Sequence, residues 1–136
     1  MRVPGIAEWP GVLEAGTSVG APISTSDYYP TVLALLGVAD DGHANPIDGE
    51  DVFSVVKGER EDRTQPIYFR DEAEYALMEG DWKLIGQGDK PPLLFNIAAD
   101  REETTDLAKD HPERLAAMQE RFAAWDEDWK QDLLSR

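Results

Sequence analysis

The sequence predicts a small mixed α/β (α+β) protein in which short strands and helices alternate and one long helix closes the chain. Residues 75–97 form short runs of alternating apolar and polar side chains broken by Gly and Pro, which is typical of paired strands. After residue 110, apolar side chains recur at intervals of three and four, which is typical of a helix with one buried face. A separate apolar helix is predicted over residues 27–36.

The composition is that of a folded, acidic protein. A chain of 136 residues suits one domain or a domain plus a detached piece, and 41% hydrophobic residues suffice for a core. The 28 acidic and 13 basic side chains give a net charge of −15, which repels nucleic acid and anionic membrane surfaces, so neither is expected as a partner. An acidic, soluble surface suited to a salty habitat explains this charge more simply than a specific cation-binding role.

The chain has no cysteine, which excludes disulfides, thiolate metal sites and cysteine nucleophiles. The residues after Met1 show no signal peptide, and no segment approaches the roughly 20 apolar residues of a membrane span. These observations leave the localisation unassigned.

In the first part of the chain, residues 4–9 are expected to form a strand that ends at a turn, residues 10–11. This strand has no preceding element to pair with. A helix then begins at residues 26–27, where either side chain can cap the first turn, and stops at Gly37. This helix is apolar almost all round, which predicts burial on more than one side.

An acidic loop over residues 38–46 leads to a short helix over residues 51–57. The charged segment 59–65 is expected to be solvated and to act as the main linker. The chain is therefore divided into residues 1–58 and residues 59–136.

The second part is expected to begin with a small sheet. Alternation places Trp82 and Leu84 on one face and Lys83 and Ile85 on the other. A short helical turn is expected over residues 104–108. The expected strands are residues 66–70, 75–79, 81–85 and 93–97.

The last helix has the clearest pattern. Asp110 with Glu113 resembles a capping box, and Pro112 lies in the first turn, where proline is tolerated. Its apolar stripe is expected to pack on the sheet, because two tryptophans suit a sheet face better than a coiled-coil seam or a cofactor site. The stripe consists of Leu115, Met118, Phe122, Trp125, Trp129 and Leu133.

Two histidines are candidates for metal chemistry. His43 lies among Asp40, Asp41 and Asn45, which is a set that could bind a metal. One histidine and two adjacent carboxylates are a weak pattern, so a solvated loop is favoured. His111 stands at a helix start and is expected to be exposed.

Other polar groups also have a simpler structural interpretation. Residues 24–26 (Ser-Thr-Ser) could hold a nucleophile, but no Gly-x-Ser-x-Gly motif surrounds them and no histidine is adjacent, so helix capping is favoured. Asp71, Glu72 and Glu74 could form an acid–base pair, although a charged turn is far more common. The Gly-Gln-Gly run at residues 86–88 lacks the Lys-Ser/Thr and the following helix of a phosphate loop.

Arg2, Arg70 and Lys83 are the cations beside apolar strands, and they could face an anionic ligand. In so acidic a chain, pairing with carboxylates is favoured. The residues themselves therefore assign no catalytic, cofactor-binding or metal-binding side chain.

Four stretches carry a family resemblance. They are RVPGIAEWPG at residues 2–11, STSD followed by PTVLALLG within residues 24–37, IDGED at residues 47–51, and GDWKLI, LFNI and DLA within residues 80–108. In order and spacing they are similar to the closing motifs of a sulfatase of the arylsulfatase type, in the alkaline phosphatase superfamily. These motifs are an Arg-x-Pro strand with a Trp-Pro-Gly turn, a Ser-Thr-x-Asp…Pro-Thr helix, an Asp-Gly-x-Asp turn and the final strands.

The sequence departs from the family pattern at Arg101, where proline is usual, and at Asp106, where asparagine is common. The larger difference is what the chain does not contain. The resemblance implies that the formylglycine nucleophile, formed in a Cys/Ser-x-Pro-x-Arg motif, and the ligands for calcium or magnesium lie upstream of Met1. It therefore transfers no catalytic residue, no cofactor-binding residue and no metal ligand, and Arg2 receives no chemical role.

The resemblance implies an architecture and a function. Residues 1–58 would be the last strand and helix of an alkaline-phosphatase-like domain, and residues 59–136 a small antiparallel sheet packed by a long C-terminal helix. The whole protein would hydrolyse sulfate esters, and the missing N-terminal catalytic part would be the partner of this chain, which alone would be inactive. Two alternatives stay open: a stand-alone binding or homo-oligomerisation module that uses exposed apolar surface, and a fragment of a related phosphoester or phosphonate hydrolase.

Overall fold

The computed structural model describes residues 3–39 and 48–134, and these form two compact units. The first unit is Met1–Gln65 and the second is Pro66–Arg136. In the described ranges no helix is long and apolar enough to cross a membrane.

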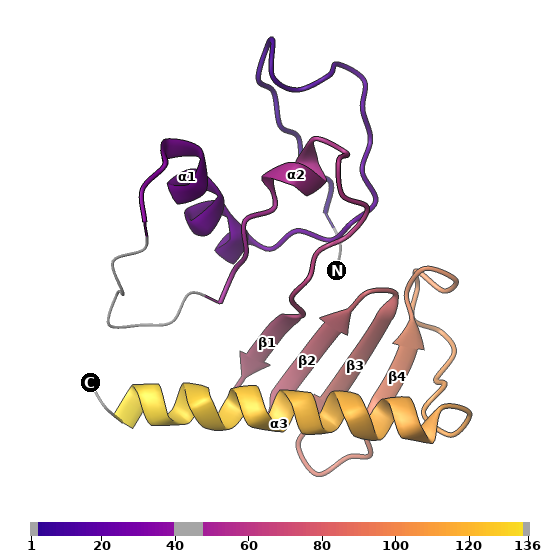
Figure 1. The fold of residues 1–136 in the computed structure, drawn as a ribbon. Helices are drawn as coiled ribbons and strands as arrows, with labels where there is room; N and C mark the ends of the chain where they lie inside the picture. Colours follow the sequence, from indigo (N-terminus) through magenta and orange to yellow (C-terminus); the bar gives the residue numbers. More distant parts are fainter. Residues whose placement is uncertain (1–2, 40–47, 135–136) are drawn as a thin grey trace. The chain divides into compact units, whose positions relative to one another are not determined.

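The second unit begins with a four-stranded antiparallel sheet in which each strand pairs with the next one along the chain (Figure 1). Register fixes two tight hairpins, since Asp71 pairs with Glu74 and Glu79 pairs with Trp82. Gly80 in the second hairpin has φ +53°, a conformation that favours glycine. The strands are β1 Ile67–Asp71, β2 Glu74–Glu79, β3 Trp82–Gln87 and β4 Leu93–Asn96, which confirms the expected sheet.

One long helix, α3 (Pro112–Leu134), covers one face of this sheet (Figure 1). Met118 and Phe122 of α3 are buried against Leu77, Leu84 and Leu94, which come from three neighbouring strands. Trp82 lies on the same face as Leu84, as the alternation predicted. The sheet and its helix therefore form a two-layer core.

Only the first four of the six residues of the predicted apolar stripe belong to the core. Leu115 and Trp125 pack against the buried cluster with Met118 and Phe122. Trp129 and Leu133 follow the same spacing, but 37% and 47% of their surfaces are exposed. Helical periodicity shows which side chains share a stripe and leaves open where the underlying sheet ends.

The start of α3 corrects the predicted cap at Asp110. The helix begins at Pro112, and the N–H of Leu115 donates to the carbonyl of His111 over 3.0 Å. His111 therefore holds the capping position, because the N–H groups of Asp110 and His111 both bond to the carbonyl of Leu107 in a preceding turn. Proline stands at the first helical position, where its missing N–H costs nothing.

The helical turn expected over residues 104–108 is wrong. The carboxylate of Asp100 accepts the N–H groups of Thr104 and Thr105, both over 2.8 Å, and Asp106 accepts those of Leu94 and Ala108. These side-chain bonds give the backbone donors partners outside a helix, so the segment is an irregular loop.

The helix expected near residues 27–36 is present in the first unit. A short 3-10 turn, η1 (Thr25–Asp27), leads into α1 (Tyr28–Leu36), and Gly37 ends it with φ +64°. The expected burial on more than one side is wrong within this chain, because α1 has no buried residue. Its exposed apolar side chains include Tyr28, Tyr29, Val32, Leu35 and Leu36.

The strand expected at residues 4–9 is also wrong. The described part of this segment is extended but unpaired, and Val3 and Ile6 are exposed. A strand needs a neighbour for its backbone bonds, and the segment pairs with none of the described strands. The turn at residues 10–11 is confirmed by the N–H of Val12 donating to the carbonyl of Trp9 over 3.0 Å.

A second short helix, α2 (Phe53–Val56), confirms the prediction for residues 51–57. Val55 is fully buried, and the ring of Phe53 lies 5.7 Å from that of Trp9. This contact gives the extended N-terminal segment an anchor within the first unit.

Candidate functional site

The most elaborate polar centre of the described chain surrounds the carboxylate of Asp27. Its side chain is fully buried and accepts four hydrogen bonds. Arg63 donates two of them, over 2.7 and 3.0 Å, and the N–H groups of Ser24 and Glu50 donate over 2.7 and 3.0 Å. The guanidinium of Arg63 is itself only 4% exposed.

The surrounding backbone is shaped to bring these donors together. Gly49 passes so close to Ser26 that a Cβ atom at residue 49 would lie 2.1 Å from the Ser26 carbonyl oxygen. This close approach lets the N–H of Glu50 donate a hydrogen bond to the Asp27 carboxylate. The carboxylate of Glu50 in turn accepts a hydrogen bond from the N–H of Thr64 over 2.8 Å. The segments 24–27, 48–50 and 63–64 are thus held by one network.

The electrostatics of this centre keep Asp27 charged. Burial raises the pKa of the Asp27 carboxyl, but the hydrogen bonds from Arg63, Glu50 and Ser24 outweigh it and hold the pKa below its usual value. A carboxylate with all its acceptor sites filled by protein donors has no free position for a substrate or a metal. The cluster therefore acts as a structural clamp.

Sequence reasoning missed this clamp. Residues 59–65 were expected to be a solvated linker, yet Arg63 is buried and Thr64 bonds Glu50. Asp27 was expected to cap α1, but its side chain makes no capping bond to that helix. Arg63 and Asp27 are far apart in sequence, and no local pattern indicates such a pairing.

The Ser-Thr-Ser group at residues 24–26 caps a helix, as favoured. The Ser24 hydroxyl accepts the N–H of Ser26, and the Asp27 side chain accepts the N–H of Ser24, so the two form a capping box. The Ser26 hydroxyl donates to that of Ser24 over 2.9 Å. In this arrangement the hydroxyls serve the backbone of η1.

Two other sequence candidates, the acidic turn at residues 71–74 and the Gly-Gln-Gly run at residues 86–88, are neighbours in the sheet. Asp71, Glu72 and Glu74 lie exposed at the β1–β2 turn, where the Glu74 carboxylate accepts a bond from Gln87. Gly86 lies in β3 against the ring of Tyr75, so the 86–88 run is strand and turn. These positions form a charged turn and a strand end, as favoured.

The described cations beside the strands are paired with carboxylates, as predicted. Lys83 contacts both oxygens of Glu103, over 2.6 and 2.7 Å, and Arg70 pairs with Asp126. The Arg70 guanidinium also lies 5.1 Å from the ring centre of Trp129. Arg2 lies outside the described residues.

Of the residues considered as metal ligands, the structure describes His111 only. Asp40, Asp41, His43 and Asn45 all lie outside the described residues. His111 is exposed, as predicted, with its ring 4.9 Å from that of Trp82. Among residues 3–39 and 48–134, no three His, Cys, Asp or Glu side chains come together in a way that could hold a metal ion.

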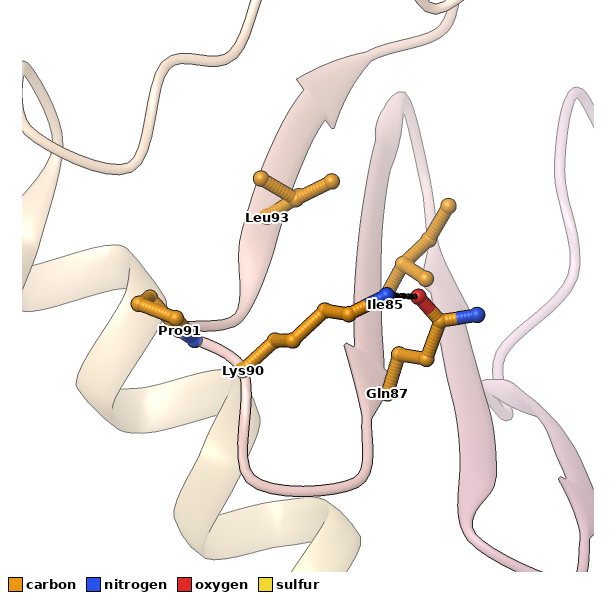
Figure 2. A pocket seen from close by; sticks show the side chains of 5 residues that line it. All are labelled: Ile85, Gln87, Lys90, Pro91 and Leu93. Carbon is orange, nitrogen blue, oxygen red and sulfur yellow. Dashed lines mark hydrogen bonds between the residues drawn. The ribbon is translucent and has the colours of Figure 1, made fainter.

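A hollow of about 370 Å³ lies at the end of β3 and the start of β4. Ile85, Pro91 and Leu93 supply its apolar lining, and Lys90 and Gln87 its polar rim (Figure 2). The Lys90 ammonium donates to the Gln87 side-chain carbonyl, as the dashed line shows (Figure 2). The hollow is mostly apolar and contains no nucleophile, so it is suited to binding rather than to catalysis.

Comparison with known proteins gives a consistent likeness, although no family model matches the chain. The choline-sulfatase of Rhizobium meliloti (strain 1021) is 31% identical over 137 residues, which cover 92% of this chain and 26% of that protein. Human arylsulfatase D is 28% identical over 144 residues, which cover 81% of this chain and 24% of that protein. The chain thus spans about a quarter of the length of the curated relatives it matches.

Solved structures give the same likeness. The crystal structure of Ps i-CgsB matches with a TM-score of 0.74 and 27% identity over 94% of this chain and 33% of its own. The phosphonate monoester hydrolase of Agrobacterium radiobacter shares the fold, with a TM-score of 0.51 and 22% identity over 75% of this chain.

Proposed function

This chain is the C-terminal portion of a sulfatase-family protein, and from this premise we propose that the whole protein hydrolyses sulfuric esters. The observation that carries the proposal is the sulfatase likeness, which runs through both units and covers 92% of the chain in the choline-sulfatase comparison. In this proposal, the chain completes the fold around a catalytic part that is encoded upstream.

The family's reactive groups do not fit the residues of this chain. It has no Cys/Ser-x-Pro-x-Arg motif from which formylglycine could form, and its described carboxylates and histidine form no group able to hold calcium or magnesium. Asp27, the most buried carboxylate among the described residues, already accepts four protein hydrogen bonds. The nucleophile and the metal ligands are therefore assigned to the upstream part, and this chain alone is expected to be inactive.

The first experiment compares two polypeptides. One is this 136-residue chain, and the other is the same chain extended through the coding sequence upstream of Met1. Both are assayed with 4-nitrophenyl sulfate and with a 4-nitrophenyl phosphonate monoester. The longer polypeptide is expected to hydrolyse the sulfate ester preferentially and to lose this activity with EDTA, while the short chain gives no turnover above buffer.

Two results would overturn the proposal. Turnover by the short chain would show that its own residues suffice for chemistry. A longer polypeptide that prefers the phosphonate ester would favour the alternative of a phosphonate hydrolase, for which the fold similarity to the Agrobacterium radiobacter enzyme is the supporting observation.

A second candidate function is a stand-alone binding or oligomerisation module. The supporting observation is the apolar surface of α1, on which Tyr28 and Leu36 are 63% and 69% exposed. Burial of such surface is favourable by roughly 25 cal/mol per Å². Self-association in light scattering, dependent on concentration and lost in Leu36→Asp, would favour this candidate, and a monodisperse monomer would contradict it.

A further inference from the structure

The two edges of the four-stranded sheet differ in how their backbone groups are used. At the β4 edge, the N–H of Leu94 donates to the Asp106 carboxylate over 3.1 Å, and the Leu94 carbonyl accepts the N–H of Leu107 over 2.8 Å. The loop after β4 therefore closes that edge. At the other edge, β1 pairs with β2 and with no other strand of the described ranges. Because only every second residue of an antiparallel strand bonds to a given neighbour, alternate N–H and C=O groups of β1 point away from β2.

The apolar stripe of α3 continues past this open edge. The Trp125 ring stacks on that of Tyr68 in β1 at 4.8 Å, and the ring centre of Trp129 lies 5.1 Å from the guanidinium carbon of Arg70, also in β1. β1 is the last strand on this side, and Leu133 follows Trp129 by about one helical turn. The C-terminal end of α3 thus extends beyond β1 (Figure 1), and Trp129 and Leu133 are 37% and 47% exposed.

The open edge of β1 together with Trp129 and Leu133 is called the β1 edge site below. A strand placed beside β1 bonds to the free backbone groups and buries its inward side chains under the end of α3. The four existing strands are held by this same combination of backbone pairing and helix cover. The β1 edge site therefore has both of the features that one more strand needs.

The charge around the β1 edge site is negative. Exposed carboxylates stand at the end of β1 and on the last turns of α3, whereas two bases of the same region, Arg70 and Lys130, both pair with Asp126. The exposed carboxylates are Asp71, Glu72, Glu74, Glu127 and Asp128. They attract a basic partner and repel a second copy of this chain, which carries a net charge of −15.

We propose that the β1 edge site binds an extended, cationic segment of another protein by strand addition. The segment pairs with β1 as a fifth strand and places apolar side chains, at alternate positions, against Trp129 and Leu133. Its Lys or Arg side chains pair with the exposed carboxylates. In this mode of recognition main-chain hydrogen bonds supply the affinity and alternate side chains supply the specificity. The proposal is independent of sulfate ester hydrolysis.

The probe is the synthetic peptide KVKVKVK, in which the valines share one face of a strand and the lysines share the other. Two peptides serve as controls. EVEVEVE reverses the charge, and KVKVKVK with every backbone nitrogen methylated cannot donate hydrogen bonds to a strand edge. Binding of each peptide to the 136-residue chain is measured by tryptophan fluorescence. Heteronuclear NMR then identifies the backbone amides whose signals shift.

Three variants test the helix part of the site. Trp129→Ser and Leu133→Ser remove its apolar side chains, and Ala123→Ser is the matched control elsewhere on α3. All three positions are exposed, so each variant keeps the buried core. KVKVKVK is expected to shift the amides of β1 and not those of β4. Its affinity should fall about tenfold in Trp129→Ser and in Leu133→Ser, because each loses a buried apolar contact, and should not change in Ala123→Ser.

Several results would overturn the proposal. Equal binding of EVEVEVE or of the methylated peptide would show that charge or backbone pairing plays no part. Shifts spread over β4 and the first unit would show only unspecific attraction to an acidic protein. Hydrogen exchange without peptide tests the other occupants. Slow exchange of alternate β1 amides that depends on protein concentration would assign the edge to a second copy. Slow exchange found only in the polypeptide extended upstream of Met1 would assign the edge to that upstream part.

Discussion

Arg63 donates two hydrogen bonds to the buried carboxylate of Asp27, although 36 positions separate the two residues in the sequence. Both side chains are almost completely removed from solvent, at 4% and 0% exposure. A two-point contact of this kind fixes both distance and orientation. It therefore ties the start of α1 to the segment that ends the first unit.

Removal of the Arg63 guanidinium is expected to destabilise the first unit strongly. Arg63→Ala leaves a buried carboxylate without its counter-charge, which costs about 3–5 kcal/mol in comparable sites. The free energy of unfolding is measured in urea, with hydrogen exchange at the amides of residues 24–36 as the probe of the first unit. The matched control is Lys57→Ala, because the Lys57–Glu59 ion pair is solvent-exposed and is expected to contribute about 1 kcal/mol or less. Similar losses in both variants would contradict the clamp.

The stability of the first unit should fall in acid. The folded-state pKa of Asp27 lies below its unfolded value, because the hydrogen bonds from Arg63 and from two backbone N–H groups outweigh the effect of burial. The stabilisation is therefore complete above the unfolded pKa, near pH 3.9, and is lost as the pH falls through the lower folded pKa.

This pH dependence is tested with Asp27→Asn. The free energy of unfolding is measured from pH 6 to pH 2.5, and the gap between the wild type and the variant is expected to narrow below about pH 4. Asp100→Asn is a second test, in the second unit, where the bond from the Thr105 N–H is the largest cause of a lowered pKa of Asp100, so its gap should narrow in the same direction. A gap for Asp27→Asn that stays constant with pH would show that Asp27 does not titrate with folding.

Local patterns in the sequence were sufficient to predict the sheet and the long helix of the second unit. The β2–β3 hairpin could be predicted because Gly80 and the alternation on either side lie in one continuous segment, residues 74–87. The capping role of Ser24 was predictable for the same reason. Predictions failed where a distant partner or a competing side chain decides the structure.

The failures have specific physical causes. The segment 104–108 was predicted to be helical, but the N–H groups of Thr104 and Thr105 donate to the Asp100 carboxylate and not to a helix. In the sequence, Arg63 is one of several charged residues in a segment expected to be solvated, because its partner Asp27 is distant in the sequence. The apolar character of α1 predicted burial on more than one side, yet no residue of that helix is buried.

Replacement of Gly86 is expected to destabilise the sheet. A Cβ atom at residue 86 would lie 2.0 Å from two ring atoms of Tyr75, and that ring is stacked on Phe122 at 4.2 Å. Gly86→Ala should therefore lower the free energy of unfolding by about 1–3 kcal/mol through overpacking. Gly20→Ala is the control, because a Cβ atom there meets nothing within 4 Å. Near-UV circular dichroism during thermal unfolding reports the displaced aromatic stack, and an unchanged spectrum would contradict the expected clash.

The buried and the exposed parts of the α3 stripe should contribute differently to the free energy of unfolding. Phe122 is 6% exposed and packs against Tyr75 and Trp125, so Phe122→Ala is expected to cost about 3–5 kcal/mol through lost contacts and a cavity. Leu133 has the same helical spacing but is 47% exposed, so Leu133→Ala should change stability by about 0.5 kcal/mol or less. Urea unfolding of both variants, monitored by tryptophan fluorescence, measures the difference. If Leu133→Ala proves as costly as Phe122→Ala in the 136-residue chain, the end of α3 must be covered in solution, most simply by a second copy, and the assignment of that helix end as free surface fails.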